Sequence, residues 1–186
     1  MSRLIDLFFG SILLTLLFFP IVLIALLILL KDKENPFYVS KRIGQYNCQF
    51  LMPKFRTMKS NSPQKATHLL EDPEQYMLST GRFLRKYSLD ELPQIFSVIR
   101  GDMTFVGPRP ALFNQYDLIS QRTKVDINEL KPGITGWAQV NGRDELTIEK
   151  KVQYDEEYLR RSSLIFDIYI IGLTILRVIK KDGISH

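Results

Sequence analysis

The chain has 186 residues and a formal net charge of +5, with 25 lysines and arginines against 20 acidic residues. This length suits one domain, or one domain with an appendage. The single cysteine, Cys48, excludes an intrachain disulfide and a cysteine-rich zinc site, and having only two histidines disfavours a histidine-rich metal site. The basic balance suits anionic partners, which include membrane surfaces, nucleic acids and phosphorylated substrates.

Residues 7–30 form an apolar run without a charge, and only Ser11 and Thr15 interrupt it. A helix needs about 20 apolar residues to cross the hydrocarbon core of a bilayer, so the run is long enough. A cleaved signal peptide would have a shorter apolar stretch that ends in small residues, whereas this run ends in the charged residues 31–34. The simplest interpretation is a single-span membrane anchor.

Pro20 and the flanking charges support a second interpretation of this run. A proline inside a helix removes a backbone hydrogen bond and kinks the helix. Arg3 precedes the run and Lys31 and Lys33 follow it, so both ends prefer the cytoplasmic side of a membrane. A helix–break–helix that enters and leaves by one face satisfies both ends, but other groups must then satisfy the interrupted backbone. Both interpretations stay open.

After Lys33 the composition becomes that of a globular domain, and Asn35-Pro36 marks the boundary. We therefore expect a membrane segment at 1–34 and a second domain at 35–186. The patterns in that domain predict, in chain order, a short strand within 49–59, a loop at 61–67, helices at 81–87 and 89–100, a loop at 101–110, a helix at 111–130, a turn-rich stretch with a hairpin at 131–143, and a helix at 147–161.

The stretch 164–179 is again strongly apolar. Asp167, Thr174 and Lys181 recur at intervals of seven, with Arg177 nearby, and this spacing places one polar stripe on a helix. An interfacial helix in the membrane plane explains the stripe better than a second span, because Asp167 would be costly at depth. An ordinary core helix of the domain explains the pattern equally well, and both interpretations stay open.

Two adjacent carboxylates, Asp90 and Glu91, lie at an expected helix start within residues 87–94. In one interpretation Ser88 and Glu91 form a Ser-x-x-Glu capping box, and Asp90 merely favours the helix dipole. In the other, Asp90 is an ionised nucleophile or a magnesium ligand beside a phosphate-binding helix end. The motif is common, so taken alone it favours the capping box.

Cations in other segments could bind phosphate. Lys54 and Arg56 would share one face of a strand, Arg109 lies between two prolines, and Arg143 follows an Asn-Gly turn. Each alone suits a solvated surface charge, but together they could clamp a diphosphate bidentately. The sequence has no Gly-x-x-x-x-Gly-Lys, Gly-x-Gly-x-x-Gly, His-Glu-x-x-His or Asp-x-Asp motif. The common phosphate loops and the metal grip of nucleotide-sugar glycosyltransferases are thereby disfavoured.

Four segments carry a family resemblance when they are taken in order: Lys-Phe-Arg-Thr-Met at 54–58, Ser-Leu-Asp-Glu-Leu-Pro-Gln at 88–94, Gly-Asp-Met-Thr-Phe-Val-Gly-Pro-Arg-Pro at 101–110, and Lys-Pro-Gly-Ile-Thr-Gly-Trp-Ala-Gln-Val-Asn-Gly-Arg at 131–143. With them the chain closely resembles the bacterial sugar transferases, the monotopic phosphoglycosyl transferases that start glycan assembly on polyprenyl phosphate. The resemblance covers essentially the whole chain, in what looks like the minimal catalytic form. The fold expected is α+β and mostly helical, with a short β-hairpin region.

The resemblance also implies a location. The N-terminal segment would be a re-entrant membrane helix with both ends on the cytoplasmic face of the bacterial inner membrane, and amphipathic interfacial helices would accompany it. Phe19-Pro20 stands where the family pattern has Ser-Pro.

The resemblance further implies a reaction. Asp90 would attack the sugar-linked phosphate of a UDP-sugar and expel UMP, and polyprenyl phosphate would then take the phospho-sugar from the aspartyl intermediate. The product, a polyprenyl-diphosphate-sugar, begins assembly of an O-antigen, capsule, exopolysaccharide or glycoprotein glycan. Mg²⁺ would bind near Asp90 and Glu91, and Glu91 could also assist the acceptor. The candidates for binding phosphate or nucleotide are Lys54, Arg56, Arg85, Arg109, Arg143 and Asp155.

By analogy we expect a UDP-linked N-acetylated amino sugar, with UDP-hexoses as the alternative, and no nucleic-acid partner. The rival hypotheses are a membrane-anchored binding or scaffold protein without turnover, and a membrane phosphohydrolase in which water replaces the lipid. Neither rival explains the four ordered motifs. The sequence leaves the sugar, the pathway and the oligomeric state open.

Overall fold

The computed structural model describes residues 3–63, 72, 74–142 and 145–180. Helices dominate this part of the chain, and the α-helices are α1 (Arg3–Leu27), α2 (Gly81–Lys86), α3 (Ile95–Arg100), α4 (Tyr116–Thr123), α5 (Trp137–Val140), α6 (Ile148–Arg161) and α7 (Leu164–Lys180). One π-helical turn, η1 (Ile28–Asp32), extends α1. The 3₁₀ turns are η2 (Gln45–Asn47), η4 (Glu74–Tyr76), η5 (Leu89–Gln94) and η6 (Ile127–Glu129). The strands are β1 (Phe37–Ile43), β2 (Gln49–Phe55), β3 (Thr104–Val106), β4 (Ala111–Leu112) and β5 (Gly133–Thr135).

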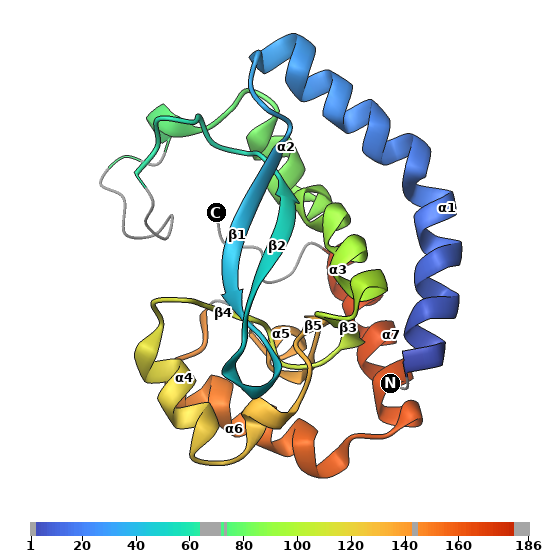
Figure 1. The fold of residues 1–186 in the computed structure, drawn as a ribbon, viewed down its shortest axis with the longest axis vertical. Helices are drawn as coiled ribbons and strands as arrows, with labels where there is room; N and C mark the ends of the chain where they lie inside the picture. The colour runs from blue at the N-terminus through green and yellow to red at the C-terminus, as the bar shows by residue number, and fades with distance from the viewer. Residues whose placement is uncertain (1–2, 64–71, 73, 143–144, 181–186) are drawn as a thin grey trace.

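The apolar N-terminal run forms one continuous helix. Together α1 and η1 span Arg3–Asp32, 30 residues with a mean hydropathy of 3.2, long and apolar enough to cross a membrane. Pro20 lies inside α1 without ending it, and Figure 1 shows the helix changing direction near its middle. The expected break is therefore a bend, as is usual for a proline in a long helix.

Both ends of this long helix are bound to the rest of the protein. At its start, Arg3 donates to two backbone carbonyls near the end of α3, and Asp6 accepts a 2.9 Å hydrogen bond from Thr104 Oγ1. At its end, Asp32 accepts from the backbone N–H and the hydroxyl of Ser79, at 3.0 and 2.7 Å. The helix therefore lies along one side of the molecule, beside α3, as Figure 1 shows.

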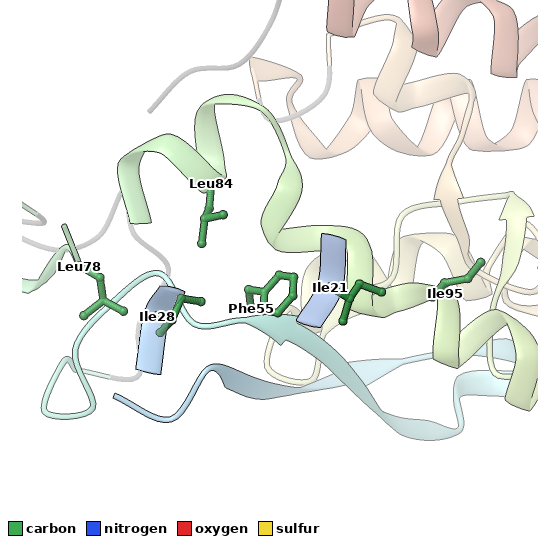
Figure 2. Packing of buried hydrophobic residues seen from close by; sticks show 6 residues of the cluster. All are labelled: Ile21, Ile28, Phe55, Leu78, Leu84 and Ile95. Atoms are coloured by element: carbon green, nitrogen blue, oxygen red, sulfur yellow. The ribbon is translucent and has the colours of Figure 1, made fainter. Parts of the chain in front are cut away.

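A hydrophobic cluster fills the space between the long helix, the hairpin and the short helices (Figure 2). Six buried side chains, contributed by α1, η1, β2, α2, α3 and the segment before α2, form it: Ile21, Ile28, Phe55, Leu78, Leu84 and Ile95. Burial of apolar side chains of this size contributes roughly 1.5–3 kcal/mol each. The cluster fixes the position of β2 relative to η5 and α3, and those elements carry the candidate site.

The sheets are small. Strand β1 pairs antiparallel with β2, with Phe37 opposite Phe55, and its far end pairs antiparallel with β4, with Ile43 opposite Ala111. Strands β3 and β5 pair in parallel. The strand predicted within 49–59 is confirmed as β2, but the hairpin predicted at 131–143 is wrong, because the hairpin of the described chain is β1–β2. The predicted loop 101–110 contains β3, whose three residues are too short to show an alternating pattern.

Some of the predicted helices are confirmed by the structure and others are not. Those at 81–87, 147–161 and 164–179 are confirmed as α2, α6 and α7. The helix predicted at 89–100 divides into the 3₁₀ turn η5 and α3, and Pro93 at the end of η5 accounts for the change, because proline cannot supply an α-helical N–H. The single helix at 111–130 is wrong. Residues 111–112 extend the edge of the sheet instead, and Asp126, in a left-handed conformation with φ 57°, precedes η6.

Helix α7 faces the protein with its polar stripe. Asp167 is only 2% exposed and lies 2.7 Å from the hydroxyl of Tyr158, and Thr174 Oγ1 lies 2.7 Å from Thr135 Oγ1. Lys181, the third member of the stripe, lies outside the described residues. The opposite face is apolar and open, since Ile165 is 82% exposed.

Candidate active site

Glu91 is the centre of a small ionic cluster. Its Oε1 atom accepts from Lys54 Nζ at 2.9 Å and from Arg109 Nη2 at 3.1 Å. The three side chains are largely enclosed, with exposed fractions of 13% for Glu91, 14% for Lys54 and 28% for Arg109. Three segments distant in sequence, namely β2, η5 and the loop after β3, thus meet at one carboxylate oxygen.

The alternation of β2 explains why Lys54 reaches the site. Successive side chains of a strand point to opposite faces. Phe55 is 2% exposed in the hydrophobic cluster, so Lys54, its neighbour, points the other way, toward η5. Burial lowers the pKa of Lys54, although Glu91 opposes this shift.

The backbone that carries Arg109 is held in place from two sides. Gly107 and Gly136 bring two loops into close contact, because a Cβ on Gly136 would lie 2.0 Å from the Gly107 carbonyl oxygen. Behind the loop, Arg122 Nη1 donates to the Arg109 carbonyl at 2.8 Å, and Arg122 Nε donates to Asp155 Oδ2 at 2.9 Å. Asp155 is 1% exposed, so the structure assigns it contacts that position Arg109 through Arg122.

Asp90 occupies a different environment from Glu91. Burial raises the pKa of Asp90, and the neighbouring Glu91 raises it further, while Lys54, Arg85 and Arg109 oppose the shift. Burial also lowers the pKa of Arg85, whose charge interacts with Asp90 and whose Nε donates to Thr57 Oγ1 at 3.0 Å. A carboxylate that burial destabilises in its charged form is more basic than an ordinary aspartate.

The capping-box interpretation is wrong. Ser88 has a left-handed conformation, with φ 53°, and its side chain makes no capping hydrogen bond. Glu91 binds the two cations instead of returning to the Ser88 backbone N–H as the motif requires. A non-glycine residue with positive φ costs of order 1–3 kcal/mol and such residues cluster at functional sites. The two carboxylates are therefore placed by a strained turn rather than by a helix cap.

Two other predicted residues lie apart from the ionic cluster. Strand β2 ends at Phe55, and the guanidinium of Arg56 donates to the carbonyls of Asn35 and Phe37, at 2.8 and 3.3 Å. Its described contacts thus tie the start of β1 to the end of β2. Arg143 lies outside the described residues.

A cleft of about 230 Å³ opens beside Glu91 and Arg109. Its lining comes from α1, η5 and the residue before it, the start of α3, the loop after β3, the β5–α5 region and the end of α7: Leu13, Leu17, Ser88, Glu91, Leu92, Ile95, Arg109, Ile134, Thr135, Gln139, Val140, Gly142, Thr174, Arg177 and Val178. Asp90 is adjacent in sequence to this lining and is not part of it. Sequence reasoning did not single out Arg122, Gln139 or Ser88 as site residues, although Gln139 lies inside the fourth motif. It noted Arg177 only as part of a polar stripe.

The carboxylates of Asp90 and Glu91 suit a divalent cation that takes its remaining ligands from water and substrate. The described residues contain no group of three or more His, Cys, Asp or Glu side chains that could form a complete protein cage. Asp90 and Glu91 offer two adjacent hard carboxylates. Mg²⁺ usually takes one or two carboxylates and completes its octahedron with water and substrate phosphates. The donor set therefore fits Mg²⁺ that arrives with a phosphorylated substrate.

The chain is similar to a known protein family and to several of its members. The family model described as bacterial sugar transferase matches residues 1–181. An uncharacterized sugar transferase of Bacillus subtilis, EpsL, is 40% identical over 84% of this chain and 76% of its own length. The UDP-glucose:undecaprenyl-phosphate glucose-1-phosphate transferase of Xanthomonas campestris pv. campestris is 43% identical over 77% of this chain, but over 31% of its own length.

A third relative is the UDP-N-acetylgalactosamine-undecaprenyl-phosphate N-acetylgalactosaminephosphotransferase of Aeromonas hydrophila. It is 34% identical over 90% of this chain and 41% of its own length. The chain thus spans most of the Bacillus relative and less than half of the other two.

Proposed function

The chain belongs to the bacterial sugar transferase family, and from this premise we propose that it transfers a sugar 1-phosphate from a UDP-sugar to undecaprenyl phosphate. The products are UMP and an undecaprenyl-diphosphate-sugar. The observation that carries the proposal is the pairing at η5: Asp90, with a raised pKa, adjoins Glu91, which two cations hold at the edge of a cleft. The names of two relatives, which describe UDP-sugar and undecaprenyl-phosphate transferases, agree with it.

In the first step, an Asp90 carboxylate oxygen attacks the phosphorus that bears the sugar. The bond between this phosphorus and the bridging diphosphate oxygen breaks, and UMP leaves with that oxygen and its electron pair. The environments of the two carboxylates support this division of roles. Two cations neutralise Glu91 Oε1 and reduce its nucleophilicity, whereas burial keeps Asp90 basic.

In the second step, a phosphate oxygen of undecaprenyl phosphate attacks the same phosphorus, and the Asp90 carboxylate leaves unchanged. Lys54 and Arg109, which hold Glu91, would bind phosphate oxygens, and electrostatic stabilisation of this kind is a large part of phosphoryl-transfer catalysis. Asp90 and Glu91 would hold Mg²⁺, which when bound supplies positive charge against the phosphates.

The contacts of α1 support a monotopic placement in the bacterial inner membrane. A straight 30-residue helix is about 45 Å long, enough to cross the bilayer. Here Arg3 and Asp6 at one end and Asp32 at the other all contact the same domain. We therefore propose that the bent helix enters and leaves by the cytoplasmic face, and that α7 lies at the interface with its apolar side toward lipid.

The donor sugar is proposed only to the level of class. The names of the relatives include a glucose 1-phosphate transferase and an N-acetylgalactosamine phosphotransferase. UDP-hexoses and UDP-N-acetylhexosamines therefore both belong in the first substrate panel, and the N-acetylated amino sugars remain our expectation.

The test is a panel of UDP-sugars incubated with the purified 186-residue chain, Mg²⁺ and undecaprenyl phosphate, in which UMP and lipid-linked sugar are measured. We expect one UDP-sugar to give both products in equal amounts. Release of sugar phosphate into water, with no requirement for the lipid, would indicate a phosphohydrolase. Absence of UMP release with every donor would leave a binding protein and would contradict the proposal.

A further inference from the structure

The cleft beside Glu91 has walls of two kinds. Near Glu91 and Arg109 it is polar, but α1 contributes Leu13 and Leu17, and the end of α7 contributes Val178. These apolar residues belong to the two helices whose outer faces are apolar and exposed. A ligand that fills this part of the cleft must therefore present apolar surface beside the ionic cluster.

Arg177 is the charged residue beside this apolar part of the cleft. Its side chain is partly buried, and across the described segments no hydrogen bond or ion pair involves it. Thr174, one turn earlier on α7, uses its hydroxyl on the Ile170 carbonyl at 2.8 Å and on Thr135 at 2.7 Å. Within the described residues, Arg177 is therefore a cation on this wall whose donors have no partner.

A guanidinium that is desolvated beside apolar side chains is unfavourable unless an anion meets it. A guanidinium also binds phosphate oxygens in a bidentate fork, a geometry that lysine does not reproduce. The ligand that matches this wall thus has an anionic phosphate attached directly to a hydrocarbon chain. Arg109 is already engaged by Glu91 at 3.1 Å, so the two cations of the cleft are suited to different tasks.

We propose that Arg177 binds the phosphate of the polyprenyl phosphate acceptor, and that Leu13, Leu17 and Val178 hold its first isoprene units. This inference rests on the proposed function and adds to it the binding site of the second substrate. The acceptor enters between α1 and α7 directly from the lipid, so that its phosphate reaches the ionic cluster without extraction of the chain into water. Each CH₂ left in lipid avoids a cost of about 0.8 kcal/mol.

Steady-state kinetics with both substrates varied separately test the proposal. In nanodiscs that contain undecaprenyl phosphate, Arg177→Met is expected to raise KM for the lipid by about 10- to 100-fold, the loss typical of a charge-assisted hydrogen bond. KM for the UDP-sugar should change by less than about 2-fold, and Arg177→Lys should recover part of the loss. Arg160→Met is the matched control, because Arg160 is 73% exposed and pairs with Glu156 outside the cleft.

A second pair of variants tests the apolar wall. Leu17 lines the cleft, whereas Leu16 is 69% exposed on the outer face of the same helix. Leu17→Trp should raise KM for the lipid in the same selective way, and Leu16→Trp should not. Unchanged UDP-sugar kinetics in each variant show that the protein is folded.

Three results would overturn the inference: wild-type kinetics in Arg177→Met, a rise in KM for the UDP-sugar alone, or equal rises for both substrates. In each of these cases, product formation by the wild-type chain would still support the proposed function. Failure of the wild-type chain with every UDP-sugar would instead remove the proposed function itself.

Discussion

Asp90 and Glu91 are consecutive residues with opposite electrostatic surroundings. Glu91 Oε1 is held by Lys54 and Arg109 at 2.9 and 3.1 Å. The pKa of Asp90 is raised, because burial and the charge of Glu91 outweigh the nearby cations. In the proposed mechanism Glu91 organises positive charge and Asp90 donates electrons, and different surroundings can give two chemically similar groups such different roles.

The raised pKa of Asp90 has a consequence for stability. A carboxyl group whose folded-state pKa exceeds its unfolded value stabilises the protein when protonated. This contribution is fully present below the ordinary value of 3.8 and is lost as the pH rises through the folded-state pKa. As the pH rises above 3.8, Asp90 therefore increasingly destabilises the fold, and Asp90→Asn should remove this cost.

We expect Asp90→Asn to melt at a higher temperature than wild type at pH 7.5 in metal-free buffer. The shift should be about 2–4 °C for each kcal/mol recovered. The difference should disappear at about pH 3, below the ordinary value of 3.8, where Asp90 is protonated in both the folded and the unfolded protein. Differential scanning calorimetry at the two pH values measures the difference in melting temperature. A variant that melts below wild type at pH 7.5 would contradict the raised pKa of Asp90.

The metal proposal has its own test. Hard carboxylate and phosphate oxygens favour Mg²⁺ over softer metals. Excess EDTA should lower UMP release at least about 10-fold, and Mg²⁺ added beyond the chelator should restore it, with equimolar Mg-EDTA as the control. Full activity in chelator would remove the metal from the proposed function.

Residue-level prediction from sequence was informative where a motif residue contributes its side chain to the ionic cluster. Lys54 and Arg109, two of the four cations of the clamp hypothesis, meet at Glu91, whereas Arg56 lies apart and Arg143 lies outside the described residues. The sequence was less informative for Arg56 and Asp155, because both bind partners that the sequence does not reveal. Arg56 binds two backbone carbonyls, and Asp155 binds the buried Arg122. Spacing along the chain carries no information on such long-range partners.

At the scale of elements, α6 and α7 are joined by a buried polar contact. The hydroxyl of Tyr158 lies 2.7 Å from Asp167 Oδ1 and 3.1 Å from the carbonyl oxygen of Val106 in β3. Burial, together with the adjacent Asp167, raises the pKa of Tyr158 above its usual range, so the hydroxyl keeps its proton and can donate it. This contact turns the polar stripe of α7 inward and leaves its apolar face outward.

Tyr158→Phe should therefore weaken the fold by about 1–3 kcal/mol, the cost of leaving a buried acceptor without a donor. Thermal unfolding in detergent micelles is the measurement, and a lower midpoint is expected. Tyr116→Phe serves as the control because Tyr116 is 73% exposed. Equal midpoints for Tyr158→Phe and wild type would show that the contact does not hold α7 in place.

Elements with strong local signals were predicted well, and those made by distant pairing were not. The periodicity of α6 and α7 and the capping residue Thr147 are readable in the sequence. The short strands β3, β4 and β5 exist only through their partners. Ala111 and Leu112 have helix-compatible side chains, yet they pair with β1 because the chain after Pro110 runs along its edge. Tertiary contacts override propensity in such segments.

At the scale of the whole molecule, the long helix and the domain form one unit with the outer face of the helix uncovered. Only 11% of the most apolar window of Arg3–Asp32 is buried inside the protein. Sequence reasoning identified the segment and its proline. It could not choose between a span and a hairpin, because that choice depends on which surfaces the two helix ends contact.

The monotopic placement makes a direct topological prediction. Cys48 is exposed and is first replaced by serine, and single cysteines are then introduced at Ser2 and Asn35. An impermeant maleimide added to intact spheroplasts should label neither position, and both should react after permeabilisation. Labelling of the Ser2 position alone from outside would mean that the helix spans the membrane.

The central claim is the covalent step at Asp90, and trapping the intermediate tests it most directly. Wild-type protein is incubated with Mg²⁺ and a UDP-sugar labelled in the sugar, without undecaprenyl phosphate, and the protein-bound label is mapped by peptide. We predict UMP release of about one equivalent and label on the peptide that holds Asp90. Asp90→Asn should show no label, although asparagine would substitute well in a capping role. Undecaprenyl phosphate added afterwards should move the label into lipid. If UMP appears only when both substrates are present and no label is retained on the protein, transfer is direct and the nucleophilic role of Asp90 is contradicted.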